Sequence, residues 1–151
     1  MNNEELVRQY AKAWNHLDIN YLEPYLSEEF HYESQFVFSA ITSKAEYIEY
    51  LSGKFSTIRE ANESGDSMLS AEIGYYNNEP CIILLQIHDE PKLTGTLTRK
   101  IVNGKEEWVS VTSKAIETVL LIECHKGKII RGDICIIPPV SDIKRTGEIP
   151  V

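Results

Sequence analysis

Two stretches in the first 65 positions carry apolar residues at intervals of three and four, which is the spacing of one helix face. The first stretch contains Leu6, Val7, Tyr10, Trp14 and Leu17. The second contains Tyr47, Ile48, Leu51, Phe55 and Ile58. Ser43 stands three residues before Glu46, which is the arrangement of a capping box. The pattern therefore predicts one helix over residues 6–17 and another that begins after Ser43 and ends at residues 62–65.

A shorter apolar pattern lies between these two stretches, over residues 18–26. Asp18 is a good N-cap residue, and Ile19, Leu22 and Tyr25 follow it at helical spacing. Pro24 lies within this segment and removes a backbone donor. We expect a helix here that is short or bent.

The aromatic segment over residues 30–38 alternates roughly and predicts a strand. Later strands are expected over residues 68–76, 81–88, 115–125 and 128–137, with turns at residues 77–78 and 126–127. Residues 93–112 contain a further turn at Asn103-Gly104, and this segment either lengthens the sheet or covers a cavity. From Pro138 onward there is no periodicity, so residues 138–151 are expected to form a tail on the surface.

This order of elements predicts a single α+β domain over residues 1–151. Three N-terminal helices are followed by an antiparallel meander, with one strand between the second and third helices. We expect a cone-shaped, curved antiparallel sheet that wraps around the helices and encloses a pocket open at one end.

Composition and charge narrow the classes of partner. The chain has 15 basic and 23 acidic residues, a formal net charge of −8 that repels phosphate backbones and argues against nucleic-acid binding. No apolar run approaches the roughly 20 residues of a membrane span, and the acidic N-terminus lacks a signal-peptide layout. Cys81, Cys124 and Cys135 lie in apolar runs, which indicates buried thiols in a reducing compartment. We expect a cytoplasmic protein with no membrane partner.

Four segments resemble the nuclear-transport-factor-2-like (NTF2-like) superfamily, in its polyketide-cyclase-like or SnoaL-like branch. They are YAKAWNHLDI at residues 10–19, YLSEEFHY at 25–32, SKAEYI at 43–48 and KGKIIRGD at 126–133. The resemblance implies a cone-shaped fold and commonly a homodimer. The superfamily includes ketosteroid isomerases, polyketide cyclases, dehydratases and members of unknown role, so the resemblance does not specify an activity.

The resemblance to ketosteroid isomerases fails at one position. It places Tyr10 where those enzymes have a tyrosine that donates to an oxyanion. It places Ser34 where they have an aspartate base, and a serine hydroxyl does not accept a proton at neutral pH without a base of its own. Glu33 is adjacent, but neighbouring strand residues point to opposite faces. Steroid isomerisation by that mechanism is therefore not expected.

Candidate ligand-binding residues come from the helix and strand patterns. Tyr10 and Trp14 share a helix face and either line the pocket or belong to the core. The strand face with Phe30, Tyr32 and Ser34 forms an aromatic wall if it faces the cone; otherwise the face with His31, Glu33 and Gln35 lines the pocket. The predicted ligand-binding residues are Tyr10, Trp14, Tyr32, Ser34, Phe36, Tyr47 and His88. The expected ligand is small and apolar or aromatic.

Asp133 is the candidate proton carrier, because it interrupts an apolar strand and burial raises the pKa of a carboxyl group. The alternative is that Asp133 pairs with Arg131, or that Arg131 contacts Glu123 across the hairpin. Alternation places Glu72 toward solvent. The four histidines are scattered and no metal-ligand or cofactor motif is present, so we expect neither a metal nor a cofactor.

The segment at residues 81–87 is apolar on both faces and needs cover on both sides. One face can meet the helices, so we expect the other to form a homodimer through the outer sheet surface. Two functions stay open. The first is a small-molecule binding protein, or an acid–base enzyme of the polyketide-cyclase or isomerase type, with Asp133 as the catalytic residue. The second is a non-catalytic dimerisation or protein-interaction module.

Overall fold

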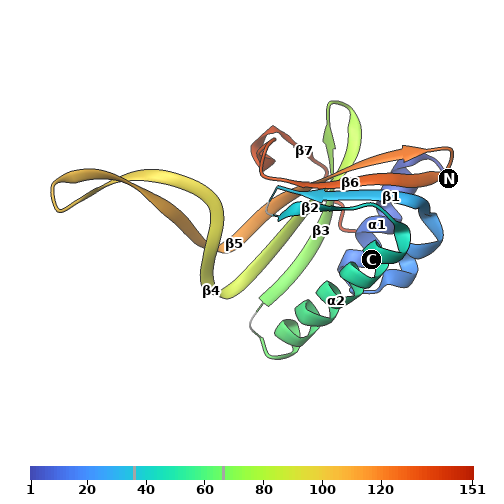
Figure 1. Ribbon diagram of the computed structural model, residues 1–151, viewed down its shortest axis with the longest axis horizontal. Helices are drawn as coiled ribbons and strands as arrows, with labels where there is room; N and C mark the ends of the chain where they lie inside the picture. Colours follow the sequence, from blue (N-terminus) through green and yellow to red (C-terminus); the bar gives the residue numbers. More distant parts are fainter. Residues whose placement is uncertain (36, 66) are drawn as a thin grey trace.

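The computed structural model describes residues 1–35, 37–65 and 67–151, and it contains one large sheet with helices on one side (Figure 1). The helical elements are α1 (Asn3–His16), the 3₁₀ turns η1 (Ile19–Tyr21) and η2 (Glu23–Tyr25), α2 (Lys44–Glu63) and η3 (Val140–Asp142). The strands are β1 (Leu26–Ser34), β2 (Val37–Ile41), β3 (Ser67–Tyr76), β4 (Glu79–Val102), β5 (Lys105–His125), β6 (Lys128–Cys135) and β7 (Lys144–Arg145).

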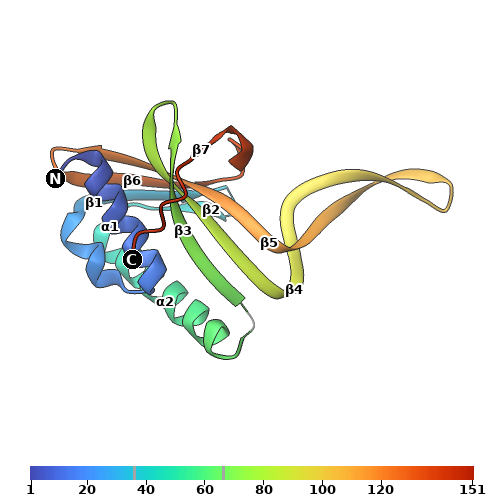
Figure 2. The same ribbon diagram turned by 180° about the vertical axis from the view of Figure 1, so that it is seen from behind.

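The seven strands lie in the order β2-β1-β6-β5-β4-β3-β7. All neighbouring pairs are antiparallel except β1 and β6, which run parallel, so the sheet is mixed rather than wholly antiparallel. The sheet curves around α1 and α2, which pack on its concave face, and the view from behind shows the chain ends on the same side as the helices (Figure 2). The predicted α+β cone is confirmed.

Both long helices begin at side-chain caps. At α2 the Ser43 half of the predicted capping box forms: Ser43 Oγ accepts from the Glu46 N–H at 3.2 Å. Asn2 and Glu5 form a complete capping box at α1, which starts the helix earlier than its apolar stripe does. The expected short helix over residues 18–26 consists of η1 and η2, and Asp18 caps η1 by accepting from the Asn20 N–H at 2.9 Å.

The prediction of one strand over residues 30–38 is wrong. The chain turns after Ser34, and β2 folds back against β1 with Ser34 opposite Val37. Gln35 holds this turn against the end of β6: its backbone N–H donates to Ile134 O at 3.0 Å, and its side-chain Oε1 accepts from the Ile137 N–H at 3.0 Å. These partners are distant in sequence, so a periodicity argument does not reveal the turn.

The later hairpins follow the predicted turns. Residues 77 and 78, 103 and 104, and 126 and 127 all have positive φ, as tight hairpin turns of the mirror-image type require. The segment over residues 91–114 lengthens β4 and β5 and projects from the rest of the sheet as a two-stranded arm (Figure 1). We call residues 91–114 the arm. A register shift between Ile87 and Lys92 separates it from the base of the hairpin, and a second shift, between Leu93 and Leu97, lies within the arm.

The sheet has a core on each face. On the concave face, α1 and α2 cover side chains such as Ile73, Ile82 and Leu120. On the convex face, Cys81, Ile83, Val119 and Ile143 form a smaller cluster. Because Ile143 belongs to the C-terminal segment (residues 138–151), that segment covers the outer side of β4. This corrects the reasoning for an uncovered outer face, although the homodimer itself stays a prediction.

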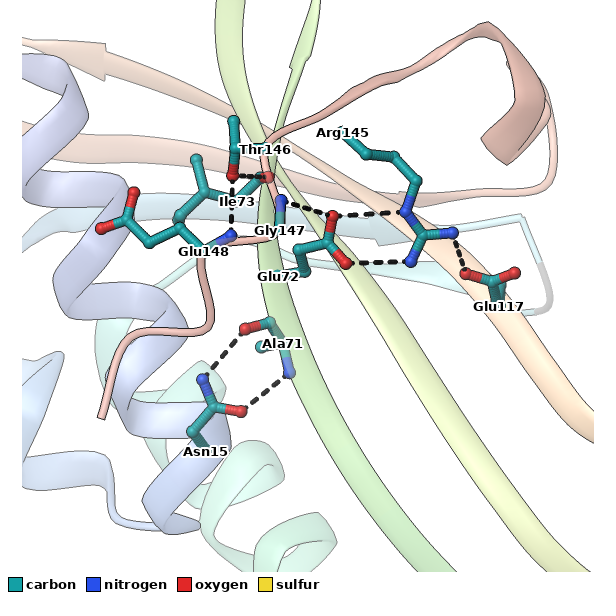
Figure 3. A network of polar contacts seen from close by, with 9 residues as sticks. All are labelled: Asn15, Ala71, Glu72, Ile73, Glu117, Arg145, Thr146, Gly147 and Glu148. Atoms are coloured by element: carbon teal, nitrogen blue, oxygen red, sulfur yellow. Dashed lines mark hydrogen bonds and ion pairs between the residues drawn. The ribbon is translucent and has the colours of Figure 1, made fainter.

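Polar contacts attach the C-terminal segment to β3 (Figure 3). The Ile73 N–H donates to Glu148 O at 2.8 Å, and Thr146 Oγ1 donates to Ile73 O at 2.7 Å. Arg145 binds Glu72 through two hydrogen bonds of 2.9 and 3.2 Å and reaches Glu117 at 2.8 Å. Glu72 does lie on the convex face, as alternation predicted, but its side chain is only 13% exposed because this segment covers it.

Candidate functional site

A cavity of about 270 Å³ lies between the helices and the concave face of the sheet. We call it the concave cavity. The lining residues are Trp14, Ser34, Tyr50, Lys54, Leu69, Leu84, Gln86, Ile116, Thr118 and Ile134. Its volume is near the lower end of the range for ligand pockets, roughly 300–1,000 Å³.

Strand register brings the sheet part of this lining together. Leu84 lies opposite Thr118, and Gln86 lies opposite both Ile116 and Leu69. Side chains alternate between faces along a strand, so these residues share the concave face while their neighbours point to the convex one. The result is an apolar wall that carries the hydroxyl of Thr118 and the amide of Gln86.

A second hollow of about 210 Å³ adjoins the concave cavity. It is lined by Tyr32, Ser34, Ser39, Ile41 and Tyr50, and it shares Ser34 and Tyr50 with the concave cavity. The face of β1 that carries Tyr32 and Ser34 is therefore the one that looks into the cone. Of the two alternatives from the sequence, the aromatic wall is the observed one.

Tyr10 and Tyr47 lie behind this wall and line none of the cavities described. Both are at most 1% exposed, and their hydroxyl groups hydrogen-bond to each other. The Tyr47 ring lies 5.0 Å from the Tyr32 ring. Burial raises the pKa of Tyr10, Tyr47 and Tyr32 above the ordinary phenol value, so all three stay protonated at neutral pH. They can donate hydrogen bonds but cannot serve as bases there.

Gly132 allows this close packing. A Cβ at that position would lie 3.3 Å from both Tyr10 Oη and Phe30 Cζ. The tyrosine of α1 therefore packs against the β6 backbone, and the space that a ligand would need beside its hydroxyl is filled by protein.

Trp14 lines the concave cavity and is only 3% exposed. Its ring packs edge-on against Phe55, with ring centroids 5.1 Å apart. The indole Nε1 is buried and has no hydrogen-bond partner among the residues that the structure describes. A buried donor without an acceptor costs about 1–3 kcal/mol, so such a group needs an explanation.

Lys54 contributes the cation of the concave cavity. Its Nζ lies 5.8 Å from the centroid of the Trp14 ring and 5.9 Å from that of Tyr50, within the range of cation–π contacts. The sequence contains a signal for Tyr50 and Lys54. They follow Tyr47 at intervals of three and four residues, so all three residues lie on neighbouring turns of one side of α2. Tyr47 was predicted to bind ligand from its place in the apolar stripe, whereas Tyr50, Lys54 and Thr118 were not predicted.

Asp133 is on the other side of the sheet. Gly132 and Ile134 face the helices, so Asp133 between them faces the convex side. Arg131 Nε and Nη2 bind its two oxygens at 2.9 and 3.1 Å, and Arg131 also lies 3.3 Å from Glu33. Asp133 therefore pairs with Arg131, which is one of the alternatives that the sequence left open. Asp133 and Glu33 line another hollow, of about 400 Å³, whose lining shares Ser34 and Ile134 with the concave cavity.

The remaining predicted residues lie apart from the concave cavity or outside the description. His88 lines a hollow of about 460 Å³ at the base of the arm, together with Asp89 and Glu90. Phe36 lies outside the described residues. Thus the structure brings Trp14, Ser34 and Tyr32 to the two adjoining hollows, and it places Asp133 and His88 elsewhere.

Two further findings apply to all the residues that the structure describes. No group of three or more His, Cys, Asp or Glu side chains is arranged to hold a metal ion. None of the described helices combines the length and apolar character that crossing a membrane requires.

Comparison with known proteins identifies solved structures of similar fold. No family model matches the chain, and no curated protein matches it. An NTF2-like protein of unknown function from Cytophaga hutchinsonii ATCC 33406 has a TM-score of 0.53 and 14% identity, with 89% of each chain covered. An uncharacterised cystatin-fold protein from Novosphingobium aromaticivorans has a TM-score of 0.55 and 12% identity, over 89% of this chain and 98% of that one.

A third structure, described as that of a proposed polyketide cyclase from Pseudomonas putida KT2440, has a TM-score of 0.53 and 16% identity. The match covers 89% of this chain and 91% of that one. At identities this low, the likeness concerns the fold and leaves the activity open.

Proposed function

We propose, on the premise that this chain has the NTF2-like fold, that it is a small-molecule binding protein whose ligand occupies the concave cavity. The observation that carries this proposal is the lining itself: an apolar wall with a few polar groups, closed by a nearly buried tryptophan whose N–H has no described partner. Ligand sites are typically apolar with few convergent polar groups. The adjoining hollow beside Tyr32 extends the space for an apolar or aromatic body.

The test is a binding titration with a neutral apolar probe, 2-naphthol, followed by its fluorescence. Saturable binding is expected for the wild-type protein. Thr118→Phe should abolish it by filling the cavity, whereas Thr98→Phe on the arm should leave it intact. Native mass spectrometry of the freshly purified protein, compared with its denatured mass, would show any retained ligand. Equal binding to all three proteins, or to none, would contradict the proposal.

An acid–base activity with Asp133 as the proton carrier is a separate hypothesis. Asp133 is paired with Arg131 and faces away from the concave cavity, so a ligand bound there would not contact it. Asp133→Asn should therefore leave 2-naphthol binding unchanged. If a turnover of the polyketide-cyclase or isomerase type is found, its loss in the same variant would support the hypothesis, and its persistence would remove that role.

The second candidate function is self-association through the arm. By register, Leu97, Ile101 and Trp108 share one face of this ribbon, and they are 61%, 76% and 63% exposed. Arg99 stacks on the Trp108 ring at 5.1 Å. A two-stranded hairpin with an exposed apolar face is marginally stable alone, so this face favours a partner.

The distribution of charge along the chain favours a second copy of the chain as that partner. The arm contains five basic and two acidic residues, whereas the rest of the chain contains ten basic and 21 acidic residues. An arm that packs on the body of another copy thus joins opposite charges, while two arms packed together would join like charges. Met68 and Ile87, opposite each other on the convex face and 69% and 45% exposed, form the apolar surface that we propose receives it.

Light scattering across micromolar concentrations tests this association. Wild-type protein should be a dimer, and both Trp108→Ser and Ile87→Glu should shift it to monomer. Thr98→Ser, on the other face of the arm, is the matched control and should remain dimeric. A strictly monomeric wild-type protein would contradict the homodimer, and a dimer insensitive to Trp108→Ser would contradict the arm.

A reducing compartment such as the cytoplasm is also proposed. Cys81, Cys124 and Cys135 are free thiols, and burial raises the pKa of Cys81 and of Cys124 to about 11. Protonated, partly or fully buried thiols behave as small apolar side chains and suit a compartment where disulfides are rare.

A further inference from the structure

We infer that the ligand of the concave cavity is an anion, specifically a small aromatic or alicyclic carboxylate whose ring occupies the apolar wall and whose carboxylate meets Lys54. This inference rests on the proposed pocket and adds its charge selectivity. Three observations support it: the sign of the charged lining, the unpartnered indole N–H, and the contrast with the other hollows.

The charged lining of the concave cavity is wholly basic. Lys54 is its one charged side chain among the described lining residues, which include no carboxylate. None of the ion pairs between described residues includes Lys54. This local positive charge favours an anionic ligand over a cationic one, against the net charge of −8 of the whole chain.

The polar groups of the concave cavity suit oxygen acceptors. Trp14 Nε1 can only donate, and its N–H lacks a described partner. The Lys54 ammonium can only donate as well, and the hydroxyl groups of Tyr50 and Thr118 can donate or accept. A carboxylate has two oxygens that accept several hydrogen bonds, so it can accept from Lys54 and from a lining hydroxyl together. The buried Trp14 N–H joins them only when the ring turns toward the ligand.

The charge balance differs in the two other charged hollows. One contains Glu33 and Asp133, and the hollow at the base of the arm contains Asp89 and Glu90 beside one cation, Lys92. Carboxylates outnumber cations among the described lining residues of both, which disfavours a carboxylate ligand. An anionic ligand would therefore be directed to the concave cavity and away from the other two.

The test compares 2-naphthoate with its neutral analogue 2-naphthamide, which has nearly the same shape. Isothermal titration calorimetry on the full chain should show at least tenfold tighter binding of the carboxylate. Lys54→Gln should abolish this preference, so that the two probes bind with equal affinity. Lys12→Gln, the same change on α1 outside the cavity lining, should keep the preference intact. Trp14→Phe should weaken the binding of 2-naphthoate more than the binding of 2-naphthamide.

The outcomes separate this inference from the proposed function. Equal binding of both probes to wild-type protein, or a preference that survives Lys54→Gln, would overturn the carboxylate inference while the pocket stands. Absence of binding by both probes and by 2-naphthol would overturn the pocket itself. Circular dichroism of each variant checks that a lost preference reflects the charge rather than the fold.

Discussion

The β4–β5 hairpin has two halves with the same secondary structure and opposite surroundings. At its base, Ile82 and Leu120 lie opposite each other and are fully buried under the helices. In the arm, Arg99 and Trp108 are also directly opposite each other, yet Trp108 is 63% exposed. Both halves consist of paired antiparallel strands. The difference in burial therefore shows that the stability of this sheet depends on what covers each face.

Cover is supplied by three segments that lie outside the hairpin in the sequence. The helices α1 and α2 cover the concave face, and the C-terminal segment covers part of the convex one. Gly74 marks how closely the second cover approaches, because a Cβ there would lie 2.7 Å from Ile143 Cγ2. No described segment lies over the apolar face of the arm, so its side chains remain available to a partner.

The largest expected effect comes from truncating a side chain in the covered half. Ile82→Ala removes a fully buried side chain and should lower the free energy of unfolding by about 3 kcal/mol. Leu97→Ala on the arm is the control, because Leu97 is 61% exposed and should change it by less than about 0.5 kcal/mol. Urea unfolding at a concentration where the protein is monomeric measures both. Similar losses in the two variants would show that the arm is covered within one chain.

The next effect concerns the attachment of the C-terminal segment. The hydrogen bonds from Arg145 hold the pKa of Glu72 below its ordinary value. A lowered carboxyl pKa stabilises the fold above the unfolded pKa of about 4.3, and this contribution disappears as pH falls through the folded pKa. Glu72→Gln should therefore cost about 2 kcal/mol at neutral pH and progressively less below about pH 4.

The arm contains the matched control for that variant. Glu106 lies 3.8 Å from Arg99, and both side chains are more than 60% exposed. An exposed pair of this kind contributes little, so Glu106→Gln should leave stability unchanged at every pH. Thermal melts of both variants between pH 3 and 7 provide the comparison. A constant difference between Glu72→Gln and wild type across that range would contradict the ion-pair explanation.

The smallest expected effect on stability is that of removing the arm. Replacing residues 91–114 with an Asn-Gly turn keeps the base of the hairpin and its covers. The free energy of unfolding of the monomer should change by less than about 0.5 kcal/mol, because the deletion leaves both cores intact. The same deletion should abolish dimerisation in light scattering. Loss of folding would show that the arm stabilises its own chain.

Much of this fold was predictable from local patterns. The stripe that includes Tyr47 and Phe55 and the cap at Ser43 predict α2, and both are local properties of the chain. The turns at residues 77–78, 103–104 and 126–127 likewise follow from residues that accept positive φ. The aromatic face of β1 was assigned correctly as well, because burying rings is favourable whatever covers them.

The candidate site was predictable only in part. Trp14, Tyr32 and Ser34 were selected from their faces, and all three line the adjoining hollows. Tyr10 and Tyr47 lie on apolar helix faces as well, but they are buried behind the lining residues. The periodicity of a sequence shows which face a residue is on and not how deeply that residue is buried. Lys54 was missed because an exposed lysine beside an apolar stripe looks like ordinary surface until the opposite sheet is in place.

The sequence by itself determined most elements of this protein: its two long helices, its tight hairpin turns and the inward face of β1, because these depend on neighbours within a few residues. Only the tertiary structure decided which residues meet. In the folded protein Asp133 pairs with Arg131 on the convex side, and Ile143 packs against Cys81 and Ile83. Lys54 lines a largely apolar cavity. Those contacts join residues far apart in the chain, and packing rather than local preference chooses among them.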